Sequence, residues 1–380
     1  MSRLAPNPAL GAALILALGM GFGRFAFTGL YPLMVHEGVL SVASGSLAAS
    51  ANYAGYLLGA LLLSRAAEHY AANLCRWALL GTLVCLAALA LPLGAWGLAG
   101  VRLLAGGFSA VSLIGASTWL LHALQRHHDA PRLFAGVGVG ILASAEVIAL
   151  GNALHWSSAL QWLLLAGLGL LVSAWLWPCL RTPPAAPQAE AAQVDAGPPG
   201  PAALPLLALY GLAGFGYIIT ATYLPLLVRD ALGNIDPVQV WAAFGLGAAP
   251  SCFFWHRLHL RLGTRGALVL NLLVQALGVV LPALRHDAFS YLASALLVGG
   301  TFMGTVTIAM PAARRAARRV RFNMLAAMTA VYGVGQILGP LASSALFGLA
   351  QSFAPALAAA AAALVLAAGL ACLPAESAGG

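Results

Sequence analysis

Three ionisable residues interrupt the long apolar stretches of this sequence. They are Arg24, Arg102 and Glu146, and Glu146 is the only acid inside such a stretch. An ionisable side chain at the centre of a membrane-spanning helix costs about 2.5–3.5 kcal/mol or more, so it normally serves a function. If the apolar stretches span a membrane, these three side chains are the first candidates for the chemistry of the protein.

The types of these residues favour proton transfer and anion binding. Burial disfavours the charged form of an unpaired carboxylate, which suits a group that must gain and lose a proton. We therefore predict that Glu146 carries a proton and that Arg24 or Arg102 pairs with it when it is ionised. Two cations against one acid leave a positive site, and a guanidinium can hold a carboxylate through two parallel hydrogen bonds. This favours an anionic or zwitterionic solute. The alternative is structural: an ion pair, or arginines that donate to backbone carbonyls between helices.

Polar and aromatic residues at helical spacing complete the predicted site. Residues three and four apart lie on the same face of a helix, and several such residues accompany the charges in both parts of the chain. The predicted substrate-binding residues are Arg24, Thr28, Tyr31, Asn52, Tyr56, Tyr217, Tyr332 and Gln336. For each of them, ordinary hydrogen bonding between helices is an equal alternative.

The composition predicts an integral membrane protein. Of the 380 residues, 61% are hydrophobic and 7% are charged, whereas about a quarter of the residues of a soluble protein are charged. The apolar stretches reach the roughly 20 residues that a helix needs to cross a bilayer. No ten-residue blocks alternate with period two, so an outer-membrane barrel is not expected. The net charge of +8 does not indicate a nucleic-acid partner, because the arginines lie mainly between the apolar stretches.

Twelve membrane-spanning helices follow from these stretches. The predicted spans are 8–35, 41–64, 74–93, 95–124, 133–154, 157–180, 203–229, 237–255, 266–284, 288–312, 322–348 and 353–373. The gap at 181–202 is rich in Pro, Ala and Gly and is predicted to be a cytoplasmic linker between a six-helix bundle at 1–180 and a second at 203–380. Fourteen of the 18 basic residues fall in loops on the side of the N-terminus, and two fall in the opposite loops. Because basic loops stay in the cytoplasm, we expect both termini on the cytoplasmic side of a bacterial inner membrane.

The two bundles are related by an internal repeat. A Gly-Phe-Gly motif, separated from a following Pro-Leu by eight residues, begins at Gly21 and again at Gly214, an offset of 193. Further glycine pairs recur at nearly the same offset. Parallel repeats of this kind place a solute site near the membrane midplane, between halves that open alternately. Small residues let helices approach closely in lipid, either as static packing or as sliding contacts at a gate. The residues predicted for this role are Gly21, Gly23, Pro32, Gly106, Gly140, Gly214, Gly216, Pro225, Gly335, Gly339 and Pro340.

These features resemble the major facilitator superfamily over almost the whole chain. The segment GMGFGRFAFTGLYPLM, from Gly19 to Met34, is similar specifically to the YbfB/YjiJ family of that superfamily. The runs GVGVG at 136–140 and GVGQILGP at 333–340 are similar too. The resemblance implies an all-α integral membrane protein with the major facilitator fold: twelve transmembrane helices in two pseudo-symmetric six-helix halves.

Two loop and helix motifs qualify this resemblance. Arg102, followed by Gly106 and Ala110, resembles a pattern in the fourth span that other members of the superfamily link to proton coupling. The loop between the second and third spans departs from the superfamily pattern, because Ser64 takes the position of its usual Asp. A gate that depends on that Asp is therefore not expected here.

An enzyme is not expected from this sequence. His122, His127 and His128 are clustered as in membrane oxidases, but the other histidines are dispersed over both sides, and a di-iron site needs several clusters in reach of one another. The five cysteines show no metal-ligand spacing. No nucleophile elbow, phosphate-binding loop or zinc-protease motif is present. We therefore expect neither a metal nor a cofactor.

The sequence thus predicts a secondary active transporter. It would move a small organic solute across the membrane by alternating access, coupled to protons, with the lipid bilayer as its surroundings and as a monomer. One alternative is an exporter of hydrophobic drugs, which would need an accommodating apolar cavity instead of a charged clamp. The other is a transporter-like sensor without flux. Neither the identity of the solute nor the direction of transport follows from the sequence.

Overall fold

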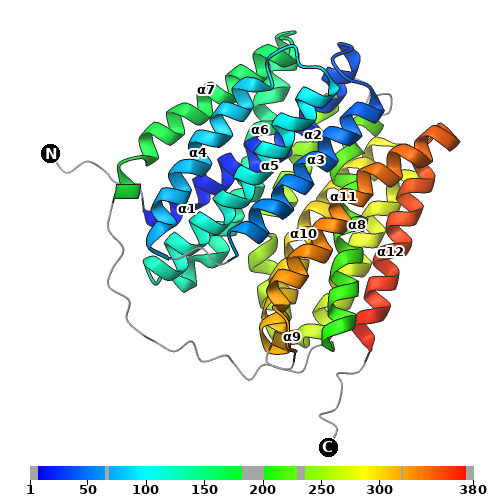
Figure 1. Ribbon diagram of the computed structural model, residues 1–380. Coiled ribbons are helices and arrows are strands. Elements are labelled where there is room, and N and C mark those ends of the chain that lie inside the picture. The colour runs from blue at the N-terminus through cyan, green and yellow to red at the C-terminus, as the bar shows by residue number, and fades with distance from the viewer. Residues whose placement is uncertain (1–6, 65–67, 182–200, 229–235, 318–319, 374–380) are drawn as a thin grey trace, which may run out of the picture.

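The chain folds into a bundle of long helices (Figure 1). The computed structural model describes residues 7–64, 68–181, 201–228, 236–317 and 320–373, and no strand occurs among them. The predicted linker at 181–202 lies almost wholly outside these residues. In Figure 1, α1 begins at the left and α12 ends at the lower right, both on the side of the bundle that faces the lower left, which we call the terminal side.

The helices match the predicted spans closely. In the first half they are α1 (Pro8–Leu16), the π-helix η1 (Ala17–Phe25), α2 (Ala26–His36), α3 (Val42–Leu62), α4 (Ala71–Ala88), α5 (Ala95–Ser117), the π-helix η3 (Thr118–Ala123), α6 (Ala130–Ala153) and α7 (Ser158–Leu176). In the second half they are α8 (Ala203–Leu227), α9 (Val238–Leu284), α10 (Ala288–Ala316), α11 (Met324–Ala350) and α12 (Ala354–Cys372). Short 3-10 turns occur at Glu68–Tyr70, His127–Asp129 and Cys179–Arg181. The segments α1, η1 and α2 run on without a gap and form the first span.

Capping residues determine where several of these helices begin. The side chains of Ser41, Asp287 and Asn323 each accept a hydrogen bond from the backbone amide three residues ahead, which satisfies one of the free donors of the first turn. Ser41 and Ser44 do so reciprocally, as a capping box. These caps lie at the ends of the apolar stretches, where the chain leaves the membrane.

The helix α9 comprises two spans. Its 47 residues would measure about 70 Å if straight, more than twice the roughly 30 Å of a hydrocarbon core. Gly263 interrupts the helix with φ 69° and ψ 176°. The sequence predicted a loop between 255 and 266 here, and the structure corrects it: helix continues on both sides of Gly263. Ten helices of the described chain are long and apolar enough to cross a membrane. The two halves of α9 and the more polar α3 bring the spans to the predicted twelve.

Two groups of helices, α1–α7 and α8–α12, lie side by side in Figure 1. The groups meet where α3 packs against α11 and where α6 packs against α9. Buried hydrophobic side chains fill the interior of both groups and continue across the boundary between them. The solute site predicted at this boundary is therefore positioned by helices from both halves.

The predicted packing glycines of the first half lie at close helix contacts. A Cβ on Gly21 would collide with the backbone of Gly140, so η1 and α6 touch through their main chains. A Cβ on Gly106 would collide with the carbonyl of Asn52, which brings α5 against α3. A Cβ on Gly23 would lie 3.0 Å from the Thr82 methyl group. Pro32 lies within α2.

The second half repeats this arrangement. A Cβ on Gly214 would lie 2.6 Å from the carbonyl oxygen of Tyr332, and one on Gly335 would collide with the carbonyl of Gly211. Both contacts hold α8 against α11. Gly339 meets Ile218 of α8 and Gly216 meets Leu364 of α12 in the same way. Pro225 and Pro340 lie inside α8 and α11.

Candidate substrate site

A cavity lies between the two halves, about halfway along the helices. Its volume is about 330 Å³, within the range of sites that hold one small molecule. Its lining runs from buried residues at mid-height, such as Arg24 and Gln336, to exposed residues such as Ser64 and Asn323 at helix ends on the terminal side. The cavity therefore opens toward the terminal side.

Arg24 is the charged residue of the cavity lining. Its side chain is buried, with 3% of its surface exposed. Within the described chain, no carboxylate lies within 4.0 Å of it. Its guanidinium lies over the rings of Tyr56, Tyr53 and Phe25, at 4.2, 5.0 and 5.2 Å from their centroids. Its Nε makes no hydrogen bond. A desolvated cation without an anion is available to a ligand that brings one.

The segment that carries Arg24 is a π-helix of nine residues, η1. π-Helical turns are rare and often mark functional sites. Glycine at positions 19, 21 and 23 lets this segment pass close to its neighbours: a Cβ on Gly19 would collide with Ser112. The local sequence thus favours an irregular, tightly packed turn that directs Arg24 into the space between the halves.

The Arg102 side chain donates hydrogen bonds to the backbone of η1. It is 1% exposed, and it donates from Nη1 to the Gly23 carbonyl oxygen at 3.1 Å and from Nη2 to the Arg24 carbonyl oxygen at 3.0 Å. Its guanidinium also lies 4.4 Å from the centroid of the Phe27 ring. Among the two arginines, Arg102 therefore matches the structural alternative, since it holds the turn that bears Arg24.

Glu146 lies apart from both arginines. It is exposed, on the same face of α6 as Val139 and Leu150, which are 47% and 56% exposed. Its Oε2 accepts a long hydrogen bond, 3.4 Å, from Nε2 of Gln239 in α9. The structure does not bring Glu146 to Arg24 or Arg102, so the expected pairing within a cavity is absent from it. The physical reason is the helix face: Gly136 and Gly140 turn inward against η1 and α1, and Glu146 points the other way.

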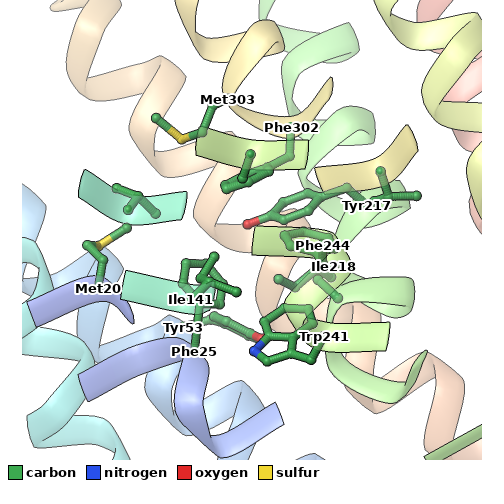
Figure 2. Close-up of a cluster of buried hydrophobic side chains, with 14 of the residues drawn as sticks. Met20, Phe25, Tyr53, Ile141, Tyr217, Ile218, Trp241, Phe244, Phe302 and Met303 are labelled. Carbon is green, nitrogen blue, oxygen red and sulfur yellow. The ribbon is translucent and has the colours of Figure 1, made fainter. Parts of the chain in front are cut away.

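Aromatic residues of the second half form one wall of the cavity. The rings of Tyr217 in α8 and Phe302 in α10 are stacked, with centroids 5.4 Å apart and planes 13° from parallel. Tyr332 of α11 stacks on Tyr217 at 5.8 Å and 21°. Figure 2 shows Tyr217 and Phe302 near Phe25 and Trp241 in this buried cluster.

The predicted second-half residues Tyr217, Tyr332 and Gln336 all line the cavity, as does Tyr56 of the first half. Gln336 donates from Nε2 to the hydroxyl of Tyr217, and its buried Oε1 makes no hydrogen bond. With Arg24, five of the eight predicted binding residues therefore come together in one place.

The other three predicted residues do not line the cavity. The hydroxyl of Thr28 donates to the Ala221 carbonyl oxygen at 2.9 Å, and that of Tyr31 donates to the Val42 carbonyl oxygen at 2.8 Å. Asn52 donates from Nδ2 to the Arg102 carbonyl oxygen at 2.9 Å. They take part in hydrogen bonding between helices, the alternative that the sequence left open.

Several lining residues were not predicted. Phe302, Met303 and Val306 of α10 and Thr329 of α11 belong to the cavity. Phe302 carries no charge and follows no motif, so its sequence position holds no signal for a site. Thr329 could have been found, because it lies seven residues before Gln336 and hence on the same face of the helix.

The side opposite the opening is closed by hydrogen bonds between the halves. They join Thr28 Oγ1 to the Ala221 carbonyl oxygen (2.9 Å), Ser46 Oγ to Tyr223 Oη (2.6 Å), Ser50 Oγ to the Ile337 carbonyl oxygen (2.9 Å) and Tyr53 Oη to Thr222 Oγ1 (3.2 Å). Tyr223 Oη also lies 3.0 Å from the Pro340 carbonyl oxygen. A cavity that is open on one side and sealed on the other is one of the two states that alternating access requires.

Solved structures share this fold. The chain superposes on a mutant of the nucleoside transporter NupG with a TM-score of 0.70 and 15% identity, covering 96% of this chain and 97% of that one. It superposes on a bacterial homologue of the human lysosomal transporter Spinster, described as inward-facing and occupied, with a TM-score of 0.71 and 15% identity over 95% of each chain. The inward-facing and unoccupied form of that homologue gives 0.66 at 14% identity, over 97% and 95%. A comparison with curated proteins yields no match.

The long apolar helices, together with a family match over most of the chain, define a multi-pass membrane transporter of the major facilitator superfamily. Within that class, residues 16–372 match the family described as uncharacterised MFS-type transporter YbfB. The chain belongs to this family, and the resemblance expected from the segment between Gly19 and Met34 is confirmed.

Proposed function

We propose that this transporter moves a small organic anion or zwitterion across the bacterial inner membrane by alternating access. The observation that carries the proposal is Arg24: a buried cation, without an acidic partner among the described residues, that faces a cavity between the halves. A ligand carboxylate would neutralise this charge and accept charge-assisted hydrogen bonds from the guanidinium, whose Nε has no other partner. An organic cation would meet an unbalanced positive charge in a poorly solvated site and would be repelled.

The proposed orientation places the terminal side in the cytoplasm, because the basic loops lie there. With that orientation the structure corresponds to an inward-facing state. The two structural relatives described as inward-facing are consistent with such a state in this fold.

Reconstitution tests the proposal. The purified protein in proteoliposomes should exchange an organic anion or an amino acid across the membrane in a counterflow assay, and Arg24→Gln should weaken solute affinity about 10- to 100-fold, as expected for losing hydrogen bonds to a charged group. Arg285→Gln is the matched control, since Arg285 is exposed, lies outside the cavity lining and pairs with Asp287 at 2.9 Å.

Saturable flux of a cationic drug that is unchanged in Arg24→Gln would favour the drug-exporter alternative, which the largely apolar lining of the cavity would suit. Flux of no solute would favour the sensor.

We further propose that transport is coupled to protons through Glu146. What supports this is its place: an acid within a span, at the seam between α6 and α9, with Gln239 of the other half as its neighbour. Protonation would then respond to the opening of the seam and not directly to solute in the cavity. In Glu146→Gln, accumulation driven by an imposed pH gradient should be lost while counterflow, which needs no gradient, persists. Unchanged gradient-driven accumulation would remove Glu146 from the coupling.

A further inference from the structure

We infer that the solute is an aromatic monocarboxylate that also bears a hydroxyl group away from its carboxylate, with the hydroxybenzoates as the simplest members. This inference rests on the proposed transport function and names the substrate class of the same cavity. It follows from three features of the lining: one cation, a wall of stacked rings, and a buried amide oxygen without a partner.

The single cation favours a single negative charge. Among the residues that line the cavity, Arg24 alone carries a charge, and most of the others are Ala, Leu, Ile, Val, Met, Phe or Tyr. Arg102 lies outside this lining, and each of its terminal nitrogens donates to a carbonyl of η1. A dicarboxylate would bring a second charge into an apolar space with no counterion, at a high desolvation cost.

The stacked wall favours a flat ring. Phe302, Tyr217 and Tyr332 lie nearly parallel and all border the cavity. Aromatic pairs in offset-stacked or edge-to-face geometry gain more than their buried area alone provides. An aliphatic acid of similar size would bury the same area without this gain. The rings of Tyr53 and Tyr56 already lie on the Arg24 guanidinium, so the carboxylate end of the site is also bordered by aromatic faces.

The free amide oxygen favours a hydroxyl. Gln336 is 1% exposed; its Nε2 is taken by the Tyr217 hydroxyl, and its Oε1 is left without a partner. Buried polar atoms in native proteins are almost always paired. A ligand hydroxyl could donate to this oxygen, and its own oxygen remains able to accept from neighbouring donors. Arg24 belongs to the first half and Gln336 to the second, so one ligand that satisfies both would bridge the two halves across the cavity.

Binding to the purified, full-length protein tests the inference. The probes are 3- and 4-hydroxybenzoate, compared with benzoate, cyclohexanecarboxylate, succinate and benzylammonium, by calorimetry and by counterflow in proteoliposomes. At least one hydroxybenzoate should bind about five- to tenfold more tightly than benzoate, the gain expected from one buried neutral hydrogen bond. Benzoate should in turn bind more tightly than cyclohexanecarboxylate, and succinate and benzylammonium should not compete.

Two variants separate this result from a general loss of the site. In Gln336→Leu the preference for the hydroxybenzoate over benzoate should fall to less than about twofold, because the acceptor for the ring hydroxyl is removed. Benzoate itself should still bind, since Arg24 and the stacked rings remain in the lining. Thr307→Val is the matched control: the Thr307 hydroxyl donates to the Met303 carbonyl oxygen within α10 at 2.8 Å and lies outside the cavity lining, so the preference should stay. Equal preference in wild type and Gln336→Leu would overturn the role of the hydroxyl.

Failure of the substrate class and failure of the proposed function give different results. Arg24-dependent flux of succinate, of cyclohexanecarboxylate in preference to benzoate, or of an aliphatic amino acid would overturn the aromatic hydroxy acid and leave an anion or zwitterion transporter in place. Binding or flux of benzylammonium in preference to all the acids would overturn both.

Discussion

Arg24 and Arg102 have the same charge and are both buried, yet they differ in what they touch. The guanidinium of Arg24 faces aromatic rings and the cavity, whereas both terminal nitrogens of Arg102 donate to carbonyls of η1. Under the proposed function, Arg102 would act on the solute only through Arg24, by holding the turn from which that side chain projects. It is a positioning residue in this fold.

This assignment predicts a specific phenotype for Arg102→Lys. An ammonium group cannot reproduce the fork that spans two carbonyl oxygens, so η1 should loosen and the free energy of unfolding should fall by about 1–3 kcal/mol. The Kd of the anion should rise while the selectivity among anions stays the same, because the residues that touch the solute are unchanged. Thermal unfolding and anion binding measure the two effects, with Arg285→Lys as the exposed control. A change of selectivity without a change of stability would show direct contact of Arg102 with the solute.

The sequence revealed the three membrane charges but not their directions. Composition and span boundaries suffice to find Arg24, Arg102 and Glu146. Which of them faces the cavity depends on the rotation of each helix, and only α6 carried a readable signal for it. Glu146 follows Gly140 by six residues and is therefore turned about 120° from the packing face of its helix. That Arg102 has a structural role could not be predicted from the sequence, because this role depends on the carbonyls of a π-helix in another span.

Among the elements, α9 and the first span have backbone features that sequence patterns do not predict. Hydropathy places nearly every span within a few residues, since lipid requires continuous helix across its core. It cannot show that helix continues on both sides of Gly263 within the predicted loop, or that the first span widens into a π-helix at η1. Both features depend on backbone geometry at glycines, whose neighbours in space are remote in sequence.

Gly263 predicts one such dependence. Its backbone, at φ 69° and ψ 176°, lies in a region that is essentially restricted to glycine. Gly263→Ala should therefore destabilise the protein by about 1–3 kcal/mol and lower its thermal midpoint in detergent. Gly167→Ala in α7 is the control, since a Cβ there would meet nothing within 4 Å. Equal midpoints for the two variants would contradict a strained hinge at Gly263.

The closed side of the cavity is held in part by a backbone carbonyl that lacks a helical donor because of a proline. Pro225 has no N–H, so the carbonyl of Ala221, four residues earlier in α8, lacks its usual helical donor. The Thr28 hydroxyl donates to this oxygen from the other half, 193 residues away. The same proline spacing that marked the internal repeat thus creates an acceptor at the boundary between the repeats.

Thr28→Val should weaken this closure. Valine keeps the shape of the side chain and removes the donor. The state in which this side is closed should therefore lose about 1–2 kcal/mol of stability relative to the state in which it is open. In a background without the native cysteines, a cysteine at Ala49, which is 1% exposed near Ser46 and Ser50, should then react about 5- to 30-fold faster with a maleimide, as that energy implies. Thr28→Ser retains the hydroxyl and should react like the parent. Unchanged labelling in Thr28→Val would show that the other hydrogen bonds suffice.

At the scale of the whole molecule, the repeat governs the scaffold and not the chemistry. A Cβ on Gly55 would collide with the Leu103 carbonyl oxygen in the first half, and one on Gly247 would approach the Leu296 carbonyl oxygen in the second, at offsets of 192 and 193. The position that corresponds to Arg24 at the same offset is Tyr217. The cavity thus places a cation in one half opposite a ring and its amide partner in the other. A solute that needs both would favour the state in which both halves reach it.

The last prediction concerns the seam between α6 and α9, along which the halves would move in the proposed transport cycle. Gly136 and Gly138 lie two residues apart in α6 and turn to different partners: a Cβ on Gly136 would collide with Ala13 in the same half, and one on Gly138 would collide with Ala249 of α9 in the other half. Gly136→Val should therefore lower the thermal midpoint of the protein, because overpacking within one bundle costs about 1–3 kcal/mol. Gly138→Val should instead separate α6 from α9, which raises maleimide labelling on the closed side and slows counterflow, with a smaller change in the thermal midpoint. The opposite result would be a larger loss of thermal midpoint in Gly138→Val and slower counterflow in Gly136→Val. It would mean that α6 and α9 move as one unit during transport, and that the halves rock about some other contact.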